Sequence, residues 1–135
     1  MLQGGTGSSD IADYQLALDA MRDGVALWTA DGHLIVTNKA AFSLMNVPPD
    51  VIYPGVARLE VMTFFARRGD YGPTDDPDAL ARTLSAGFGQ GEVTSLTRKL
   101  PDGRYVRADG RRLADGRSLV TYREVSGPAG MNAPA

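Results

Sequence analysis

Residues 18–38 read LDAMRDGVALWTADGHLIVTN. Two short apolar runs, Val25–Thr29 and His33–Thr37, flank the dipeptide Asp31-Gly32. Glycine accepts the positive φ that a tight turn needs, so this pattern predicts a β-hairpin. We therefore expect two antiparallel strands in the first third of the chain.

The first predicted strand is apolar on both of its faces. Val25 and Leu27 lie on one face, and Ala26 and Trp28 lie on the other. A sheet with one face in water alternates more cleanly between apolar and polar residues. We therefore expect a second element to cover the outer face of the sheet and Trp28, and the N-terminal helix is the nearest candidate.

The N-terminal segment predicts a flexible leader followed by an amphipathic helix. Residues 1–9 are rich in Gly and Ser, and Ser9 or Asp10 can cap a helix over residues 10–22. An apolar stripe on this helix consists of Ile11, Tyr14, Leu18 and Met21. Such a stripe is too apolar to face water alone. We therefore predict a homodimer joined through these four residues and Trp28.

Three further helices are predicted over residues 39–45, 58–68 and 77–87. Asn38 is placed to cap the first of them, and Pro48-Pro49 should end it. Gly69 follows the second helix at the position where a C-terminal glycine is expected. Asp76 or Thr74 can cap the third.

The last third of the chain predicts a three-stranded meander. The strands are expected over residues 92–100, 104–113 and 118–125, with Asp-Gly turns between them. Gly110 lies inside the middle strand and suggests a β-bulge.

Together, the predicted hairpin, helices and meander give the fold class α+β: a five-stranded antiparallel sheet with helices on one face. Residues 127–135 should be a disordered tail.

The composition excludes several kinds of chemistry. The chain has no Cys, which removes disulfides, thiolate nucleophiles, zinc-thiolate sites and covalent flavin attachment. Its single His, His33, follows a hairpin turn and should be exposed, so neither a metal site nor haem is expected. No nucleophile–base pair or phosphate-binding loop is apparent, and we predict that the chain is not an enzyme.

The location and partners follow from what the sequence lacks and from its charge. With no long apolar run and no export signal, we expect a cytoplasmic protein that does not cross a membrane. Residues 98–123 carry eight Lys and Arg against three Asp. These arginines either cover a solvated sheet face or bind an anionic partner. Nucleic acid is not expected, because the whole chain carries a net charge of −2.

The order of these motifs resembles a PAS domain. The hairpin segment Leu18–Asn38 is similar to the opening of that family, and YPGV (Tyr53–Val56) and ARRGDYG (Ala66–Gly72) resemble its middle. The segment Leu100–Ser126 resembles its last three strands. The likeness, over residues 16–126, is to a bacterial variety often fused to histidine kinases or diguanylate cyclases. We take the PAS domain to be residues 10–126.

The resemblance implies a sensory and regulatory module that dimerises and mediates signal-dependent protein–protein interaction. Its partner would be a signalling protein such as a histidine kinase. Glu124 and Ser126 stand where the family has an Asp-aliphatic-Thr triplet that couples the sheet to an output helix. One alternative is the sensor domain of a larger histidine kinase or diguanylate cyclase, and another is an anion- or nucleic-acid-binding protein that uses the Arg-rich strands.

A small ligand could lie between the concave sheet face and the helices. The candidate pocket residues are Phe42, Met45, Met62, Phe65, Leu96, Val106 and Tyr122. A dry hydrophobic core and a site for a small apolar or amphipathic ligand are both consistent with these residues. The sequence identifies no cofactor, and nothing in it points to noncovalent flavin.

Overall fold

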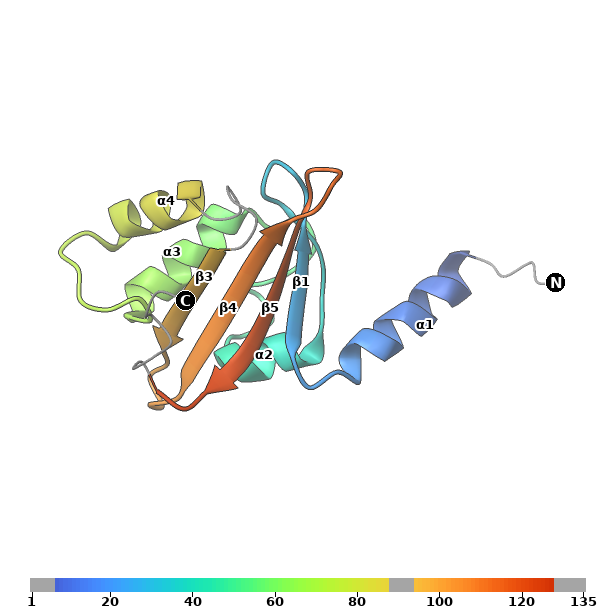
Figure 1. Cartoon of the computed structure of the whole chain (residues 1–135), viewed down its shortest axis with the longest axis horizontal. Coiled ribbons are helices and arrows are strands. Elements are labelled where there is room, and N and C mark those ends of the chain that lie inside the picture. The colour runs from blue at the N-terminus through green and yellow to red at the C-terminus, as the bar shows by residue number, and fades with distance from the viewer. Residues whose placement is uncertain (1–6, 88–93, 128–135) are drawn as a thin grey trace.

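The computed structural model describes residues 7–87 and 94–127 of the chain (Figure 1). Its helices are α1 (Gly7–Asp19), α2 (Lys39–Met45), α3 (Arg58–Arg68) and α4 (Pro77–Gly87). Its strands are β1 (Gly24–Trp28), β2 (Leu34–Thr37), β3 (Thr94–Lys99), β4 (Tyr105–Arg112) and β5 (Ser118–Val125). The five strands form one antiparallel sheet in the order β2-β1-β5-β4-β3, which confirms the predicted fold class.

The register of the sheet corrects one expectation. Gly110 pairs with Thr94 on one side and Val120 on the other without any shift, so the predicted bulge is absent at this position. The irregularity lies instead between Leu27 and Trp28, where β1 pairs with β2. The residues Glu92 and Val93 of the predicted third strand lie outside the described part of the chain.

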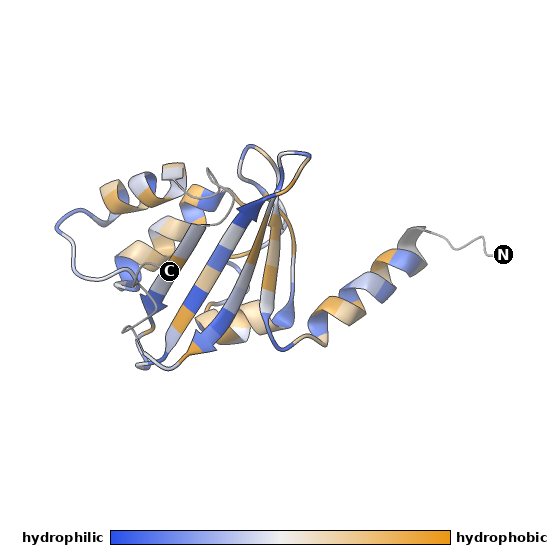
Figure 2. Ribbon diagram, viewed as in Figure 1, coloured by the Kyte–Doolittle hydropathy of each residue, from blue (hydrophilic) through white to orange (hydrophobic). Residues whose placement is uncertain are grey.

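One face of the sheet carries α2, α3 and α4, and the hydrophobic core lies beneath these helices. Because strand residues alternate between the two faces, β4 buries Val106, Ala108 and Gly110 and leaves the residues between them partly exposed. The same alternation is visible along β4 in Figure 2. α4 packs on α3 through Ala81, which is buried beside Met62 and Ala66.

Trp28 belongs to this core and not to the outer face. Its side chain is only 3% exposed, and it clusters with Leu34, Val120 and Tyr122 on the helix-covered side. The prediction that Trp28 forms part of a dimer interface is therefore wrong. The physical reason is the side of the sheet to which Trp28 belongs. Trp28 pairs with Ser118 of β5, which faces inward, so its side chain lies on the same, helix-covered face.

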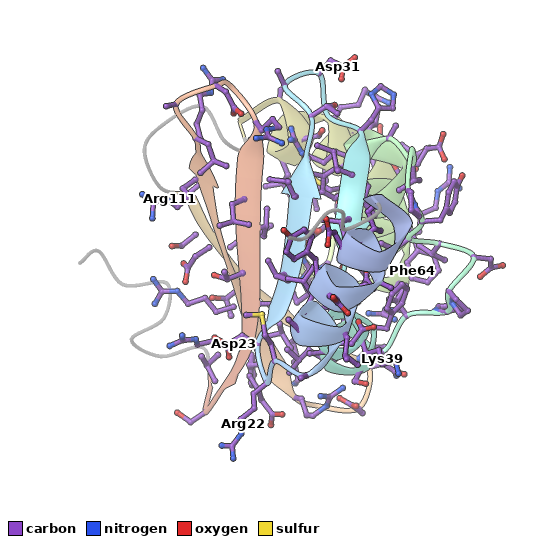
Figure 3. The ribbon with its side chains drawn as sticks, turned by 90° about the vertical axis from the view of Figure 1, so that its right-hand side faces the viewer. Arg22, Asp23, Asp31, Lys39, Phe64 and Arg111 are labelled. Atoms are coloured by element: carbon purple, nitrogen blue, oxygen red, sulfur yellow. The ribbon has the colours of Figure 1, made fainter. Side chains whose placement is uncertain are left out.

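α1 does not cover the sheet either. Figure 1 shows this helix projecting away from the rest of the domain, and in Figure 3 it comes toward the viewer, in front of the other elements. It begins at Gly7, so Ser9 and Asp10 lie within its first turn and do not precede it. It ends at Asp19 and not at the predicted Arg22, which leaves Met21 in the turn that follows. The predicted leader and tail, except for Gly7–Ser9 and Gly127, lie outside the described residues.

Asn38 ties α1, β1 and α2 together. Its side-chain oxygen accepts hydrogen bonds from the backbone nitrogens of Val25 (2.9 Å) and Ala41 (3.2 Å), the second being the expected cap of α2. Its side-chain nitrogen donates to the carbonyls of Leu18 (2.7 Å) and Asp23 (3.1 Å). The carbonyl of Leu18 is thus bound to Asn38, and the carboxylate of Asp19 accepts from the Lys39 nitrogen, which fixes the end of α1.

The remaining helix ends follow from local chemistry. α2 ends at Met45, as its predicted range has it, and its C-cap Asn46 has a left-handed φ of 50°. The helix therefore stops before Pro48-Pro49 is reached, and the prolines are not what ends it. Gly69 ends α3 with a φ of 92°, and Asp76 accepts from the Ala79 nitrogen at the start of α4, as predicted. In the described ranges, none of the helices is both long and apolar enough to cross a membrane.

Gly24 allows β1 to approach α2 closely. A Cβ atom on Gly24 would lie 2.8 Å from the Cα atom of Ala41, which is closer than real Cβ atoms come to a neighbouring backbone atom. The Asp23-Gly24 step is therefore more than a turn signal: it lets the first strand and the capped helix pack together.

Candidate functional site

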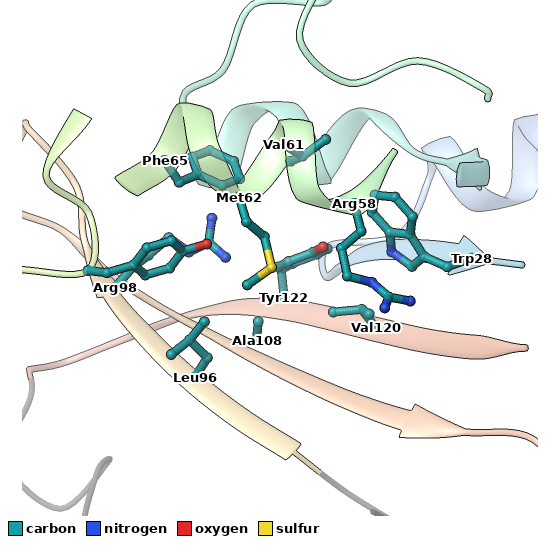
Figure 4. A pocket seen from close by; sticks show the side chains of 11 residues that line it. Trp28, Arg58, Val61, Met62, Phe65, Leu96, Arg98, Ala108, Val120 and Tyr122 are labelled. Atoms are coloured by element: carbon teal, nitrogen blue, oxygen red, sulfur yellow. The ribbon is translucent and has the colours of Figure 1, made fainter. Parts of the chain in front are cut away.

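A small cavity lies between α3 and the inner face of the sheet (Figure 4). Its lining consists of Trp28, Arg58, Val61, Met62, Phe65, Tyr71, Leu96, Arg98, Ala108, Val120 and Tyr122. The space open to the centres of water molecules is about 30 Å³, which is room for roughly two waters. The lining is mostly apolar, and its two cations and two tyrosines are the polar groups that could orient a ligand.

Arg98 is the least expected member of this lining. Its side chain comes from β3 and is 4% exposed. Its Cζ atom lies 4.2 Å from the centre of the Phe65 ring and 5.3 Å from that of Tyr71. Such cation–π contacts contribute about 2 kcal/mol when they are desolvated.

The hydrogen bonds of Arg98 leave its buried charge poorly matched. One terminal nitrogen donates to the Met45 sulfur at 3.4 Å, which is a weak acceptor. Its Nε has no hydrogen-bond partner, and no ion pair joins it to a carboxylate within residues 7–87 and 94–127. A buried cation that forms no ion pair is costly, so this position is unusual for a purely structural arginine.

Arg58 and two tyrosines complete the polar part of the cavity. The Cζ of Arg58, from α3, lies 5.5 Å from the centre of the Trp28 ring, and burial lowers its pKa. Burial raises the pKa of Tyr122 to about 12, although the nearby Arg98 and Arg58 oppose the shift. Burial also raises the pKa of Tyr71, whose hydroxyl has no hydrogen-bond partner in the described part of the chain.

A buried ion pair closes one end of α3. Arg68 donates two hydrogen bonds of 2.8 Å to the carboxylate of Asp70, which is 2% exposed. Arg68 also donates to the carbonyls of Asn46 and Met45 at the end of α2, and the Asp70 carbonyl accepts from Lys99 of β3. The ARRGDYG segment therefore joins two helices to the sheet next to the cavity.

The structure brings four of the seven candidate pocket residues to the cavity. Met62, Phe65, Leu96 and Tyr122 line it. Phe42, Met45 and Val106 do not, because α2 packs on another part of the sheet, where Met45 and Val106 are almost fully buried in the core. The candidate pocket was therefore wrong at these three positions.

Sequence reasoning missed the other seven lining residues, which are Trp28, Arg58, Val61, Tyr71, Arg98, Ala108 and Val120. For Arg98 a signal was present: Leu96, Arg98 and Leu100 alternate within the predicted strand 92–100, and the two leucines face inward. The interpretation of residues 98–123 as a solvated basic face therefore fails at Arg98.

The two residues predicted to couple the sheet to an output lie at the end of β5. Glu124 and Ser126 are exposed. The carboxylate of Glu124 lies 3.6 Å from one terminal nitrogen of Arg104. The other terminal nitrogen of Arg104 donates to the Ser43 carbonyl of α2 at 3.3 Å. Their role in coupling stays a prediction.

Comparison with known proteins identifies the fold family. Residues 18–129 match the family described as the PAS fold. The chain belongs to the PAS family. A PAS domain from Bordetella pertussis BvgS has 16% sequence identity and a TM-score of 0.56, over 89% of this chain and 89% of that one. A domain of a sensory box sensor histidine kinase/response regulator from Geobacter sulfurreducens has 19% identity and a TM-score of 0.50, over 87% and 96%.

A curated relative of this PAS domain is the non-motile and phage-resistance protein of Caulobacter vibrioides. The two are 26% identical over 110 residues, which is 82% of this chain. The chain spans only 12% of that relative's length. PAS domains are sensory units that occur in signalling proteins, and this chain shares their fold.

Proposed function

We propose that this PAS domain is a non-catalytic, cytoplasmic sensory module that binds a small molecule in its core and acts as a homodimer on a signalling partner. The observation that carries the proposal is the cavity beneath α3, where buried polar groups converge on a mostly apolar space. Residues of both the sheet and α3 line the cavity. A molecule bound in it would therefore contact both layers and change how they pack together.

α1 supports the dimeric part of the proposal. Ile11 and Tyr14, which lie on the predicted stripe of α1, are 68% and 69% exposed, and Leu18 of the same stripe is half-buried. An isolated helix of 13 residues is marginal in water. In the described part of the chain, the side chain of Gln15 donates to the Thr37 carbonyl at 2.9 Å, and Leu18 and Asp19 make the bonds described above. A second copy of α1, related by a two-fold axis, would cover these apolar side chains.

Two contacts connect the sheet with the ends of the domain. Arg123 of β5 pairs with Asp23, in the turn between α1 and β1, at 3.2 Å. Arg104 links Glu124 of β5 to the carbonyl of Ser43 in α2. We infer that a shift in the sheet on ligand binding reaches α1 and the end of β5 through these contacts. A histidine kinase is the partner class that the Geobacter neighbour's domain context favours.

The second candidate function is the sensor domain of a larger protein. The match to the Caulobacter relative favours this candidate, because the matched PAS domain makes up only 12% of that protein's length. Binding of a polyanion is less well supported. Arg104, Arg107, Arg117 and Arg123 each pair with an aspartate. These pairs neutralise much of the basic character that the sequence of residues 98–123 suggests.

Native mass spectrometry of the gently purified chain tests the ligand. We expect the native protein to have a larger mass than the polypeptide alone. This excess mass should disappear under denaturing conditions, because a molecule held in the cavity is released on unfolding. Purification from several growth media separates a specific ligand from a medium component. Ligand-free protein from every medium would contradict the small-molecule part of the proposal.

A further inference from the structure

Arg98 and Tyr71 present unpartnered hydrogen-bond donors to one end of the cavity. The Nε of Arg98 and the hydroxyl oxygen of Tyr71 are both buried, and neither has a hydrogen-bond partner in the described part of the chain. The two side chains are neighbours, with 5.3 Å between the Arg98 Cζ atom and the centre of the Tyr71 ring. Both line the cavity, so a molecule inside it can reach them.

The chemistry of these donors defines their complement. A guanidinium offers several N–H groups in a planar fork, and a phenol can donate one more hydrogen bond. A carboxylate accepts several hydrogen bonds and matches the guanidinium fork in shape and charge. The aspartate near this end, Asp70, is already engaged by Arg68 through two hydrogen bonds. An acid from outside the chain would therefore neutralise Arg98.

The rest of the cavity favours a small, partly apolar anion. Figure 4 shows Arg98 and Arg58 toward opposite ends, with Met62 between them. Leu96, Ala108 and Val120 add apolar surface to the lining. The space of about 30 Å³ suits a group of a few atoms, and the flexible side chain of Met62 can yield to a short tail. Arg58 contributes a second positive charge that favours an anion.

We propose that the cavity binds a small organic monocarboxylate, with its carboxylate on Arg98 and Tyr71 and its short apolar tail against Met62. This inference rests on the proposed function and narrows its ligand to one chemical class. The ligand enters the cavity as the anion, and no covalent step takes place.

Melting of the full chain in millimolar acetate or propionate tests the proposal. Acetamide has almost the same shape as acetate without the charge, and sodium chloride supplies another anion at equal ionic strength. We expect the carboxylates to raise the melting temperature in a saturable way and the two controls to leave it unchanged. An equal shift with acetamide or with chloride, or no shift with any carboxylate, would overturn the proposal.

Variants locate the site. Arg98→Met should weaken carboxylate binding by at least about tenfold, because it removes charge-assisted hydrogen bonds. Arg111→Met makes the same change at an exposed position of β4, on the side of the sheet opposite Phe64 (Figure 3), and should bind as wild type does. Unchanged binding by Arg98→Met would refute the site.

A further variant covers the case in which Arg98→Met does not fold. Arg98→Lys keeps the positive charge but loses the planar fork, so it should bind acetate more weakly than wild type. Native mass spectrometry separates the two proposals: a neutral molecule in the purified protein would reject the carboxylate and leave the small-molecule function standing.

Discussion

The guanidinium of Arg98 lies over the ring of Phe65, with 4.2 Å between the Cζ atom and the ring centre. Phe65 comes from α3 and Arg98 from β3, so this contact joins the helical layer to the edge strand across the cavity. Arg68, one turn of helix away from Phe65, lies 5.3 Å from the same ring but has Asp70 as its partner. The two arginines therefore allow a direct comparison.

Arg68→Met should destabilise the ligand-free protein much more than Arg98→Met. Removing Arg68 leaves the buried carboxylate of Asp70 without its cation, which should cost about 3–5 kcal/mol in the free energy of unfolding. Removing Arg98 replaces a buried, unneutralised charge by an apolar chain of similar length, so we expect stability within about 1 kcal/mol of wild type, or higher. Urea unfolding measures both. Equal losses would show that Arg98 has a stabilising partner.

Phe65→Ala should destabilise the domain by about 3–5 kcal/mol, because the ring is 2% exposed and a large cavity would remain. Phe64→Ala serves as the matched control, since Phe64 is the next residue of α3 and is only partly buried. Thermal or urea unfolding should show the larger loss at Phe65. A smaller loss there than at Phe64 would contradict the packing of α3 on the sheet.

Asn38→Ala should cost about 3 kcal/mol or more. The substitution removes four hydrogen bonds and leaves the backbone groups of Val25, Leu18 and Asp23 to find new partners. Ser43→Ala changes an exposed residue of the same helix and should stay within about 0.5 kcal/mol of wild type. If the two variants unfold at the same urea concentration, Asn38 does not join α1, β1 and α2 as described.

Stability should fall as the pH rises from about 10 to about 12. Burial raises the pKa of Tyr122 from 10.0 to about 12, so the folded chain keeps a proton that the unfolded chain loses in this range. The difference of about two pKa units corresponds to roughly 3 kcal/mol, fully present below pH 10 and lost as the pH rises toward 12. Unfolding at stepped pH should show this loss, and Tyr122→Phe should flatten it. A pH dependence unchanged by Tyr122→Phe would place the tyrosine in water.

The fold was largely predictable because its signals are local. Asp-Gly turns, the Asn38 cap and Gly69 each mark an element end through their own backbone chemistry, and all of them are found where the pattern placed them. The cavity was less predictable, because its lining depends on which part of the sheet each helix covers. Met45 and Phe65 are both large apolar residues on predicted helices, so both carry the same signal in the sequence. Both are buried in the core, but only Phe65 lines the cavity.

Trp28 and Arg98 show two different limits of pattern reasoning. β1 is apolar on both faces, so alternation alone could not say which face Trp28 shares with the helices. Arg98 alternates in phase with Leu96 and Leu100, but its charge argued for the surface. Its burial becomes clear only when the rings of Phe65 and Tyr71 are brought beside it by the fold.

The proposal that the domain acts as a homodimer joined through α1 is tested most directly by sedimentation at micromolar concentration. Tyr14→Glu places a charge on the exposed face of α1, and Leu59→Glu makes a similar change on α3 as a control. We predict that wild type and Leu59→Glu sediment as dimers of the 14.4 kDa chain and that Tyr14→Glu sediments as a monomer. A monomeric wild type, or a Tyr14→Glu variant that remains dimeric, would contradict the claim.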